Sequence, residues 1–351
     1  GKNGLVQYLY KVRAVQFDPI NIVGRNPDLV FQSRVQDYKP DMLYNLLYID
    51  DRKFIEHYDK EMCIYPIEDW IYFKRRRESY REKAMSRERE REALQYLDII
   101  KAEFNRFDSL SSKEIEDDRT IVWYWGTKTK LSKAVLDFMY YSGEIAVHHK
   151  TTNRKYYAPV EKLFDREILE MVDPNKAHED YVKWYVYRRI GSIGLLWNKS
   201  GQGWLGLPGV KDRAAALKSL IDEGRVYQVN IEDIKFPFYI RDCDMELLRN
   251  VCESYKSYFR CSFIAPLDNL IWDRDLIKEV FGFDYVWEIY KPKHLRKYGH
   301  YVLPVLYRDH FIARFEPVVD RNENKLIIRN WWWEGNSIKN NTTNNTTNNT
   351  T

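Results

Sequence analysis

Two stretches of the sequence repeat the same order of elements, and this repeat restricts the fold more than any other feature. Each has a helix rich in small and apolar residues, a glycine that ends the helix, and two short strands joined by a tight loop. The first comprises a helix over 130–141, the Ser142-Gly143 turn, strands 144–149 and 154–159, and a tip at Thr151-Thr152-Asn153. The second comprises a helix over 211–223, Gly224, strands 225–231 and 236–240, and a tip at Glu232-Asp233. Such a chain is expected to combine helices with small antiparallel sheets.

A helix followed by a two-stranded hairpin is the order of elements in a winged-helix module. These modules often place the helix in the major groove of DNA and the hairpin on its backbone, although many serve only as protein scaffolds. Lys130, Lys133, Arg154 and Lys155 lie on the first helix and its hairpin, where contacts with DNA phosphates are expected. The repeat therefore favours nucleic-acid binding without establishing it.

The bulk properties exclude several other classes of protein. With 351 residues, 44% of them hydrophobic, the chain can bury a large core. Since 56 Lys and Arg nearly balance 52 Asp and Glu, any DNA-binding surface must be local. The four cysteines form no CxxC pair, so they are predicted to be reduced thiols and no metal or cofactor is expected. No apolar run is long enough to span a bilayer and no signal peptide is recognisable, which predicts a cytoplasmic protein.

The fold class expected is α+β, with tandem winged-helix modules followed by a small C-terminal β-barrel or sandwich. Five short strands are expected in it, at 263–264, 285–290, 301–307, 311–318 and 325–333. The predicted divisions are a first winged-helix module at 1–66, a solvated helical connector at 67–112, further modules at 113–165 and 166–258, the barrel at 259–335, and a disordered Asn/Thr tail at 336–351. Gly1 falls inside an expected helix, so we expect residues that precede it to be absent from this sequence.

Three blocks, in this order, carry a family resemblance. The first is 15–27 with Leu29, 31–34 and 37–38; the second is 57–66; the third is 265–274 with 281–285 and 297–304. Together with the modules, they resemble the bacterial alkylpurine and interstrand-crosslink DNA glycosylases of the AlkZ/YcaQ type over nearly all of residues 5–333. The resemblance implies tandem winged-helix modules, a C-terminal β-barrel and excision of damaged bases from double-stranded DNA by a monomer without an obligate protein partner.

The family signature is Gln, an apolar residue, then Gln or Asp, and Gln16-Phe17-Asp18 resembles the Asp version, which is associated with crosslink unhooking. The resemblance implies that Gln16 and Asp18 are the catalytic pair. In an extended segment they project to the same side. An N7-alkylated purine is already cationic, so a carboxylate near the anomeric carbon would stabilise the developing oxocarbenium ion, and an amide can hold the attacking water.

The second block departs from the family pattern. Lys60-Glu61-Met62-Cys63 stands where family members usually carry His-Glu-Ala-Ser, so Lys60 and Glu61 are candidate neighbours of the active site. If Lys60 lines the site, a Schiff-base lyase step becomes conceivable. The simpler interpretation, which we favour from sequence, is a surface lysine that contacts a phosphate.

Spacing alone leaves other roles open for the first block. Asp18 or Asn21 would cap a helix if one began near Pro19. Two other functions also stay open: a non-enzymatic winged-helix regulator, although Gln16-Phe17-Asp18 precedes the modules rather than lying on a recognition helix, and an inactive family member, as Lys60 would allow.

The charged residues near these blocks also have two interpretations. Arg25 and Arg34 are expected either to bind phosphates or to pair with Asp28 and Asp37 on the surface. The string 268–274, which contains Asp268, Trp272, Asp273 and Arg274, is expected to lock a loop of the barrel rather than to act in catalysis.

Overall fold

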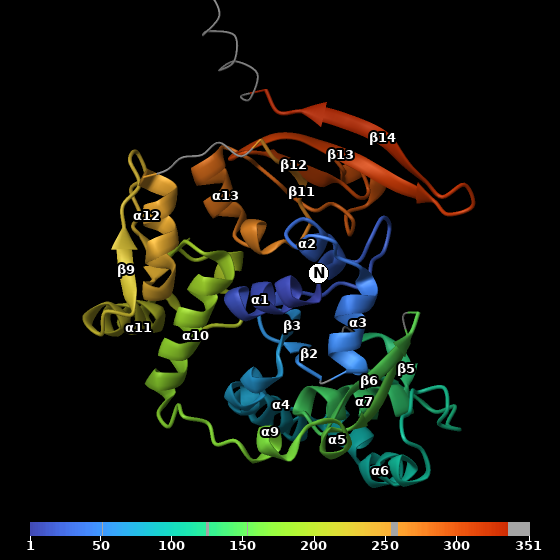
Figure 1. Cartoon of the computed structure of the whole chain (residues 1–351). Coiled ribbons are helices and arrows are strands. Elements are labelled where there is room, and N and C mark those ends of the chain that lie inside the picture. Colours follow the sequence, from blue (N-terminus) through green and yellow to red (C-terminus); the bar gives the residue numbers. More distant parts are fainter. Residues whose placement is uncertain (51, 124–125, 153, 254–258, 336–351) are drawn as a thin grey trace, which may run out of the picture. The chain divides into compact units, whose positions relative to one another are not determined.

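The computed structural model describes residues 1–50, 52–123, 126–152, 154–253 and 259–335 (Figure 1). They form two compact units. Unit 1 comprises Gly1–Met42, Lys60–Cys63 and the chain from His178 onward, and unit 2 comprises Leu43–Asp59 and Ile64–Ala177. Helices and strands occur in both units, which confirms the α+β class. The finer six-part division stays a prediction, and the expected disordered tail lies outside the described residues.

Most elements of unit 1 come from the C-terminal half of the chain. Its helices and strands are α1 (Lys2–Val12), β1 (Val15–Gln16), α2 (Asn26–Gln32), α10 (His178–Ile193), β8 (Leu196–Trp197), η3 (Gln202–Trp204), α11 (Val210–Asp222), β9 (Val226–Val229), β10 (Phe238–Arg241), η4 (Asp242–Asp244), α12 (Met245–Glu253), β11 (Cys261–Phe263), η5 (Asn269–Ile271), α13 (Arg274–Phe281), η6 (Lys293–Leu295), β12 (Leu303–Tyr307), β13 (His310–Asp320) and β14 (Lys325–Trp333).

Unit 2 is largely helical. Two elements contribute residues to both units, α3 (Pro40–Tyr48) and β3 (Met62–Pro66). The others are β2 (Phe54–Tyr58), η1 (Ile67–Phe73), α4 (Lys74–Ser86), α5 (Glu88–Leu94), α6 (Leu97–Arg106), β4 (Thr120–Val122), β5 (Lys128–Lys130), α7 (Leu131–Ser142), β6 (Ile145–Thr151), β7 (Arg154–Pro159), α8 (Val160–Leu163) and α9 (Arg166–Glu170).

Both predicted helix-and-hairpin repeats are present. In unit 2, α7 ends at Gly143, whose φ of 80° is easily adopted without a side chain, and β6 pairs antiparallel with β7. In unit 1, α11 is followed by the β9–β10 hairpin, and β8 adds a third strand in the order β8-β10-β9. Of the first predicted tip, Asn153 lies outside the described residues. The element order expected for the two repeats is therefore confirmed.

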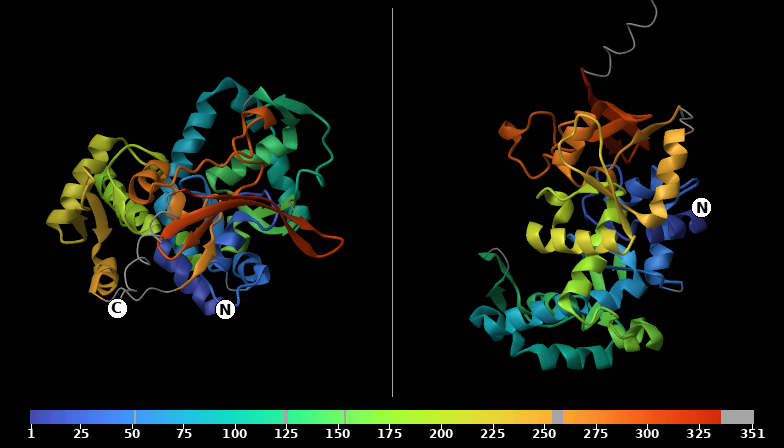
Figure 2. Two further views of the ribbon diagram at one scale, coloured as in Figure 1. Left: turned by 90° about the horizontal axis from the view of Figure 1, so that it is seen from above. Right: turned by 90° about the vertical axis from the view of Figure 1, so that its left-hand side faces the viewer.

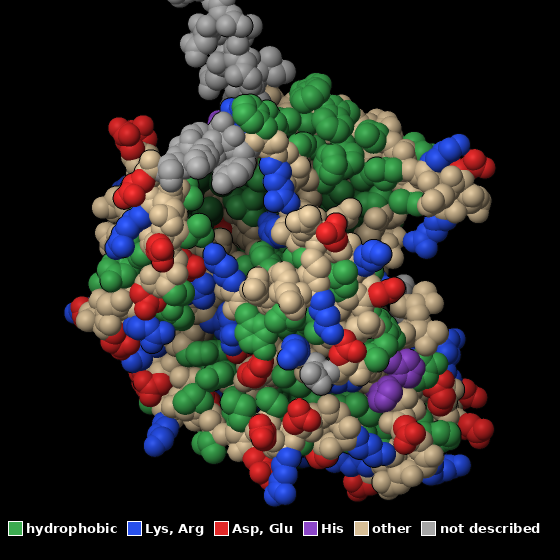
Figure 3. All heavy atoms as spheres, viewed as in Figure 1, with side chains coloured by type: hydrophobic (Ala, Val, Ile, Leu, Met, Phe, Trp, Pro, Cys, Tyr) green, Lys and Arg blue, Asp and Glu red, His purple; other side chains and the backbone are tan. Residues whose placement is uncertain are grey.

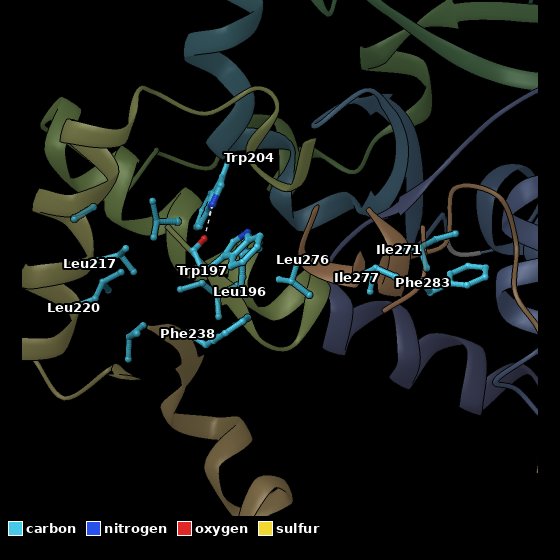
Figure 4. Close-up of a cluster of buried hydrophobic side chains, with 14 of the residues drawn as sticks. Leu196, Trp197, Trp204, Leu217, Leu220, Phe238, Ile271, Leu276, Ile277 and Phe283 are labelled. Carbon is cyan, nitrogen blue, oxygen red and sulfur yellow. Dashed lines mark hydrogen bonds between the residues drawn. The ribbon is translucent and has the colours of Figure 1, made fainter. Parts of the chain in front are cut away.

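The core of unit 1 joins the second repeat to the segment that follows η5. Aromatic and aliphatic side chains from α10, β8, α11, β10 and α13 pack together (Figure 4). The indole N–H of Trp204 donates to the Trp197 carbonyl at 2.7 Å, which satisfies a polar group inside this apolar cluster. Burial of this many large side chains makes the unit a firm support for the segments packed on it.

The C-terminal strands form an open sheet rather than the predicted barrel. Their order is β11-β12-β13-β14, all pairs are antiparallel, and in the described residues β11 and β14 remain edges. Figures 1 and 2 show the long β13–β14 hairpin extending past β11 and β12. The strand predicted at 285–290 is wrong, because the Glu288 carboxylate accepts hydrogen bonds from the backbone N–H groups of Lys297 and Tyr298 and holds this segment in a loop.

Strand β14 carries apolar side chains on both faces. The exposed ones are Leu326, Ile327, Ile328, Trp331 and Trp333. In Figure 3 hydrophobic side chains gather over this sheet. Because β14 has a partner on only one side, its side chains are less covered than those of the central strands β12 and β13.

The predicted helical connector is helical but not uniformly solvated. It is divided into η1, α4, α5 and α6. Arg77, from the basic cluster expected on an exposed face, is buried, lies 3.5 Å from the centroid of the Trp70 ring and donates to the Trp70 carbonyl. Arg75 pairs with Asp173 at 3.3 Å. In the described part of the chain, no helix is both long enough and apolar enough to cross a membrane.

Candidate active site

Gln16 ends the short strand β1 and is held on several sides within unit 1. The Phe17 N–H donates to the Met62 carbonyl at 2.8 Å, so the backbone stays paired with β3 beyond Gln16. The Gln16 side chain is 8% exposed, and its Oε1 accepts a hydrogen bond from Lys60 Nζ at 3.3 Å. Because Lys60 occupies the amide oxygen, the amide nitrogen of Gln16 is the part of the side chain that can still donate to another molecule.

Two asparagine side chains fix the backbone around Gln16. Asn26 Nδ2 donates to the Gln16 carbonyl at 2.7 Å, and its Oδ1 accepts from the Leu267 N–H at 2.9 Å. Asn269 Nδ2 donates to the Ala14 carbonyl at 2.8 Å. The first and third sequence blocks are thereby joined at Gln16. Sequence analysis did not assign a role to either asparagine, and the sequence signal was weak because both stand at helix starts, where asparagine is common.

Asp18 follows the strand in a turn and is half-buried. Its Oδ1 accepts from the Ile20 N–H at 2.9 Å, and its Oδ2 accepts from the Tyr290 hydroxyl at 3.2 Å. Burial raises the pKa of Asp18 above its ordinary value, and these two hydrogen bonds offset that rise only in part. The helix-cap alternative is wrong, because the next helix, α2, begins at Asn26 and Asp18 instead stabilises a turn at Pro19.

The turn after Asp18 is anchored by apolar side chains. Ile20, Ile22 and Val23 pack against the buried cluster formed by the C-terminal sheet and the loop before it, which includes Ile289 and Tyr301. The same loop carries Tyr290. This cluster anchors the turn that carries Asp18, whereas the Tyr290 side chain itself is largely exposed.

The Tyr290 hydrogen bond gives a prediction about pH. Removing the hydroxyl with Tyr290→Phe takes away an interaction that lowers the pKa of Asp18, so that pKa should rise further. If catalysis requires the Asp18 carboxylate in its anionic form, activity falls as the pH drops through this pKa. The acidic limb of the pH–rate profile should therefore lie at higher pH in Tyr290→Phe than in the wild type. An unchanged limb would show that this carboxylate is not the group that titrates.

Lys60 is not the surface residue that sequence analysis favoured. It is 6% exposed, and its Nζ lies 3.3 Å from Gln16 Oε1 and 5.5 Å from the centroid of the Trp272 ring. Burial lowers the pKa of Lys60 to about 8, and the nearby Arg189 charge lowers it as well. Glu61, the other candidate neighbour, is exposed. Lys60 therefore contacts the candidate catalytic amide directly.

The third block locks a loop, as expected, although in a helical segment and not in a barrel. Asp268 accepts from Leu270 N–H and Asp273 from Leu276 N–H, so each carboxylate caps the helix that follows it. Arg274 donates to the Pro266 carbonyl at 2.8 Å. The Trp272 side chain is buried between these contacts.

Arg34 pairs with a distant buried carboxylate instead of the nearby surface carboxylate, which was one of the two roles considered from sequence. Its guanidinium donates to Asp268 Oδ1 at 2.6 Å, and Asp268 is fully buried. Asp37 is therefore not its partner, and the charge of Arg34 is already balanced by a carboxylate. Arg25 lies 3.8 Å from Asp28, the surface pair that was one of the two alternatives. DNA contacts by Arg25 and Arg34 stay predictions.

Three of the four candidate DNA contacts in unit 2 are exposed. Lys130 lies at the end of β5 rather than on the helix, 3.4 Å from Asp118. Lys133 is on α7, and Arg154 begins β7 with its guanidinium 3.4 Å from the Tyr156 hydroxyl. These positions are compatible with phosphate contacts, which stay predictions.

Lys155 is held inside unit 2. Its Nζ lies 2.9 Å from Glu56 Oε1 and 4.7 Å from the centroid of the Tyr140 ring. Lys150 also pairs with the buried Glu56 carboxylate. A phosphate would have to compete with Glu56 for Lys155, so this residue is the least favourable of the four candidates.

An amide and a half-buried carboxylate on one strand and turn, in an α+β chain with helix-and-hairpin repeats, fit a DNA glycosylase. The model of the family described as "DNA glycosylase AlkZ-like" matches residues 9–344, and the chain belongs to this family of DNA-repair glycosylases. Its fold is similar to that of Streptomyces sahachiroi DNA glycosylase AlkZ, with a TM-score of 0.59 and 11% sequence identity over 93% of this chain and 84% of that chain. At this identity, the structural likeness concerns the fold alone.

Proposed function

We propose that this glycosylase hydrolyses the N-glycosidic bond of N7-alkylated purines in duplex DNA, with Asp18 and Gln16 as catalytic residues. The observation that carries the proposal is the placement of Asp18. Its carboxylate is half-buried, is held by Ile20 and Tyr290, and follows directly on a strand that is fixed by hydrogen bonds. A fixed negative charge of this kind is suited to a transition state in which positive charge develops on a sugar.

Bond cleavage in this proposal is hydrolytic, the monofunctional mode of base release. The C1′–N9 bond breaks with its electron pair moving to the cationic base, and the sugar becomes an oxocarbenium ion stabilised by Asp18. The Gln16 amide holds a water molecule that attacks C1′, and the proton that this water loses passes to the carboxylate. Since the leaving base is already positively charged, a strong general acid is not required.

The Asp18 version of the signature supports a further part of the proposal, the unhooking of interstrand crosslinks. The two helix-and-hairpin repeats act as winged-helix modules on the DNA backbone, with Lys130, Lys133 and Arg154 as contacts. The protein acts as a monomer, and a cytoplasmic, nucleoid-associated location stays a prediction.

A cleavage assay tests this function. Duplex DNA containing N7-methylguanine is incubated with the wild type, Gln16→Ala or Asp18→Ala, and abasic sites are then revealed with alkali. After alkali treatment, strand cleavage by the wild type and its loss in both variants are expected. Equal cleavage by all three proteins would refute the site, and tight DNA binding without any cleavage would favour a non-enzymatic regulator or an inactive family member.

A further inference from the structure

The environment of Lys60 is unusual for a lysine. Its ammonium group is buried, and the described residues show no salt bridge between it and a carboxylate; it donates to Gln16 Oε1 and lies over the face of Trp272. The nearby Cys63 and Glu61 favour its charged form, but burial outweighs them. The Arg189 guanidinium lies 5.7 Å from the centroid of the same Trp272 ring. A buried cation beside another cation and without a carboxylate partner is destabilised relative to the neutral amine.

Neutral amines are nucleophiles, and a lysine in such surroundings is a common source of Schiff bases with carbonyl compounds. The product of base excision contains such a carbonyl, because an abasic deoxyribose opens to an aldehyde at C1′. Lys60 Nζ is one hydrogen bond away from the Gln16 amide that is proposed to hold water at C1′. The flexible four-carbon stem of lysine suits a short movement from Gln16 toward that carbon.

We propose that Lys60 gives this chain a second activity, cleavage of the DNA strand at the abasic site through a Schiff base with C1′. The proposal rests on the proposed function, since it places the second reaction in the same site and on its product. It goes beyond hydrolytic base release, which alone would leave the strand intact.

The reaction requires no oxidant or reductant. The Lys60 amine adds to the C1′ aldehyde, and loss of water gives an iminium ion. Asp18 takes a proton from C2′, the C3′–O bond breaks, and the 3′ phosphate leaves with the electron pair. Water then hydrolyses the conjugated imine, which releases an unsaturated aldehyde and restores the lysine.

Borohydride trapping tests the proposal without the glycosylase step. Duplex DNA in which uracil has already been removed is incubated with the full chain and sodium borohydride, which reduces an iminium ion to a stable covalent adduct. The wild type should form the adduct, and peptide mapping by mass spectrometry should place it on Lys60. Because burial lowers the pKa of Lys60 to about 8, the trapping rate should level off above about pH 8, whereas the rate for an ordinary lysine would keep rising to about pH 10.

Variants complete the test. Lys60→Met and Lys60→Arg should lose the adduct, whereas Lys53→Met, which removes an exposed lysine near the start of β2, should retain it. Circular dichroism melting checks that each variant folds. If the Lys60 variants do not fold, the position of the adduct mapped on the wild type tests the proposal instead. An adduct on another lysine or on the Gly1 amine, or no adduct despite DNA binding, would overturn the proposal. Trapping at Lys60 without release of alkylated bases would instead refute only the proposed glycosylase function.

Discussion

Asp18→Asn is expected to slow the release of N7-methylguanine by about 100-fold to 1000-fold, the usual cost of removing one group that stabilises transition-state charge. The substitution keeps the shape of the side chain and its ability to accept from the Ile20 N–H, so the turn should persist. What disappears is the negative charge near C1′. Single-turnover kinetics with enzyme in excess measure this effect on the chemical step separately from product release.

Asp28→Asn is the matched control. Asp28 is also a partly buried carboxylate in the N-terminal segment, its pKa is raised by burial, and its Oδ1 accepts a hydrogen bond from a tyrosine, Tyr38. It has no contact with Gln16 or Lys60 among those described, so its removal should leave the rate within a few-fold of the wild type. If the two variants were equally impaired, loss of a buried carboxylate rather than of a catalytic charge would be the cause.

Asp268→Asn is expected to lower the free energy of unfolding by about 3–5 kcal/mol, the range found when one partner of a buried ion pair is removed. The carboxylate is fully buried and accepts from the Arg34 guanidinium at 2.6 Å. Without its charge, the largely buried Arg34 loses its counter-ion. Chemical denaturation followed by circular dichroism measures the loss.

Asp284→Asn removes a carboxylate from an exposed pair, in which Lys278 Nζ lies 2.9 Å from Asp284 Oδ2. It should leave the unfolding midpoint nearly unchanged, because exposed pairs contribute little to stability. The Arg34→Leu and Asp268→Leu variants, singly and together, complete a double-mutant cycle. Additive effects in that cycle would contradict the view that Arg34 and Asp268 stabilise each other.

Local sequence patterns predicted the elements that depend on nearby residues. The helix that became α7 was expected over 130–141, and its glycine stop and hairpin were expected at nearly the observed positions. Apolar spacing and a residue with positive φ suffice for such an element. The assignment of Gln16 and Asp18 as catalytic residues came instead from the family resemblance, since spacing alone allowed Asp18 to be a helix cap.

Contacts between distant parts of the chain could not be predicted. For Arg34 the sequence offered either a phosphate or the nearby Asp37, whereas its partner Asp268 is separated from it by 234 residues. Lys60 was expected on the surface, where most lysines lie, but it is buried against Gln16 and Trp272, two residues far from it in the sequence. The strand expected at 285–290 failed for a similar reason, because Glu288 binds backbone N–H groups of a later loop. Local apolar alternation contains no information on any of these contacts.

The most direct test of the account is the detection of free base. The full chain is incubated with duplex DNA containing a single N7-methylguanine, and the small-molecule fraction is measured by mass spectrometry beside samples with Gln16→Ala and Asp18→Asn. We expect the wild type to release one N7-methylguanine for each abasic site formed, at a rate far above that of either variant. Release at the same rate by the wild type and both variants, or no release by a wild-type protein that binds the duplex, would contradict the assignment of catalysis to Gln16 and Asp18.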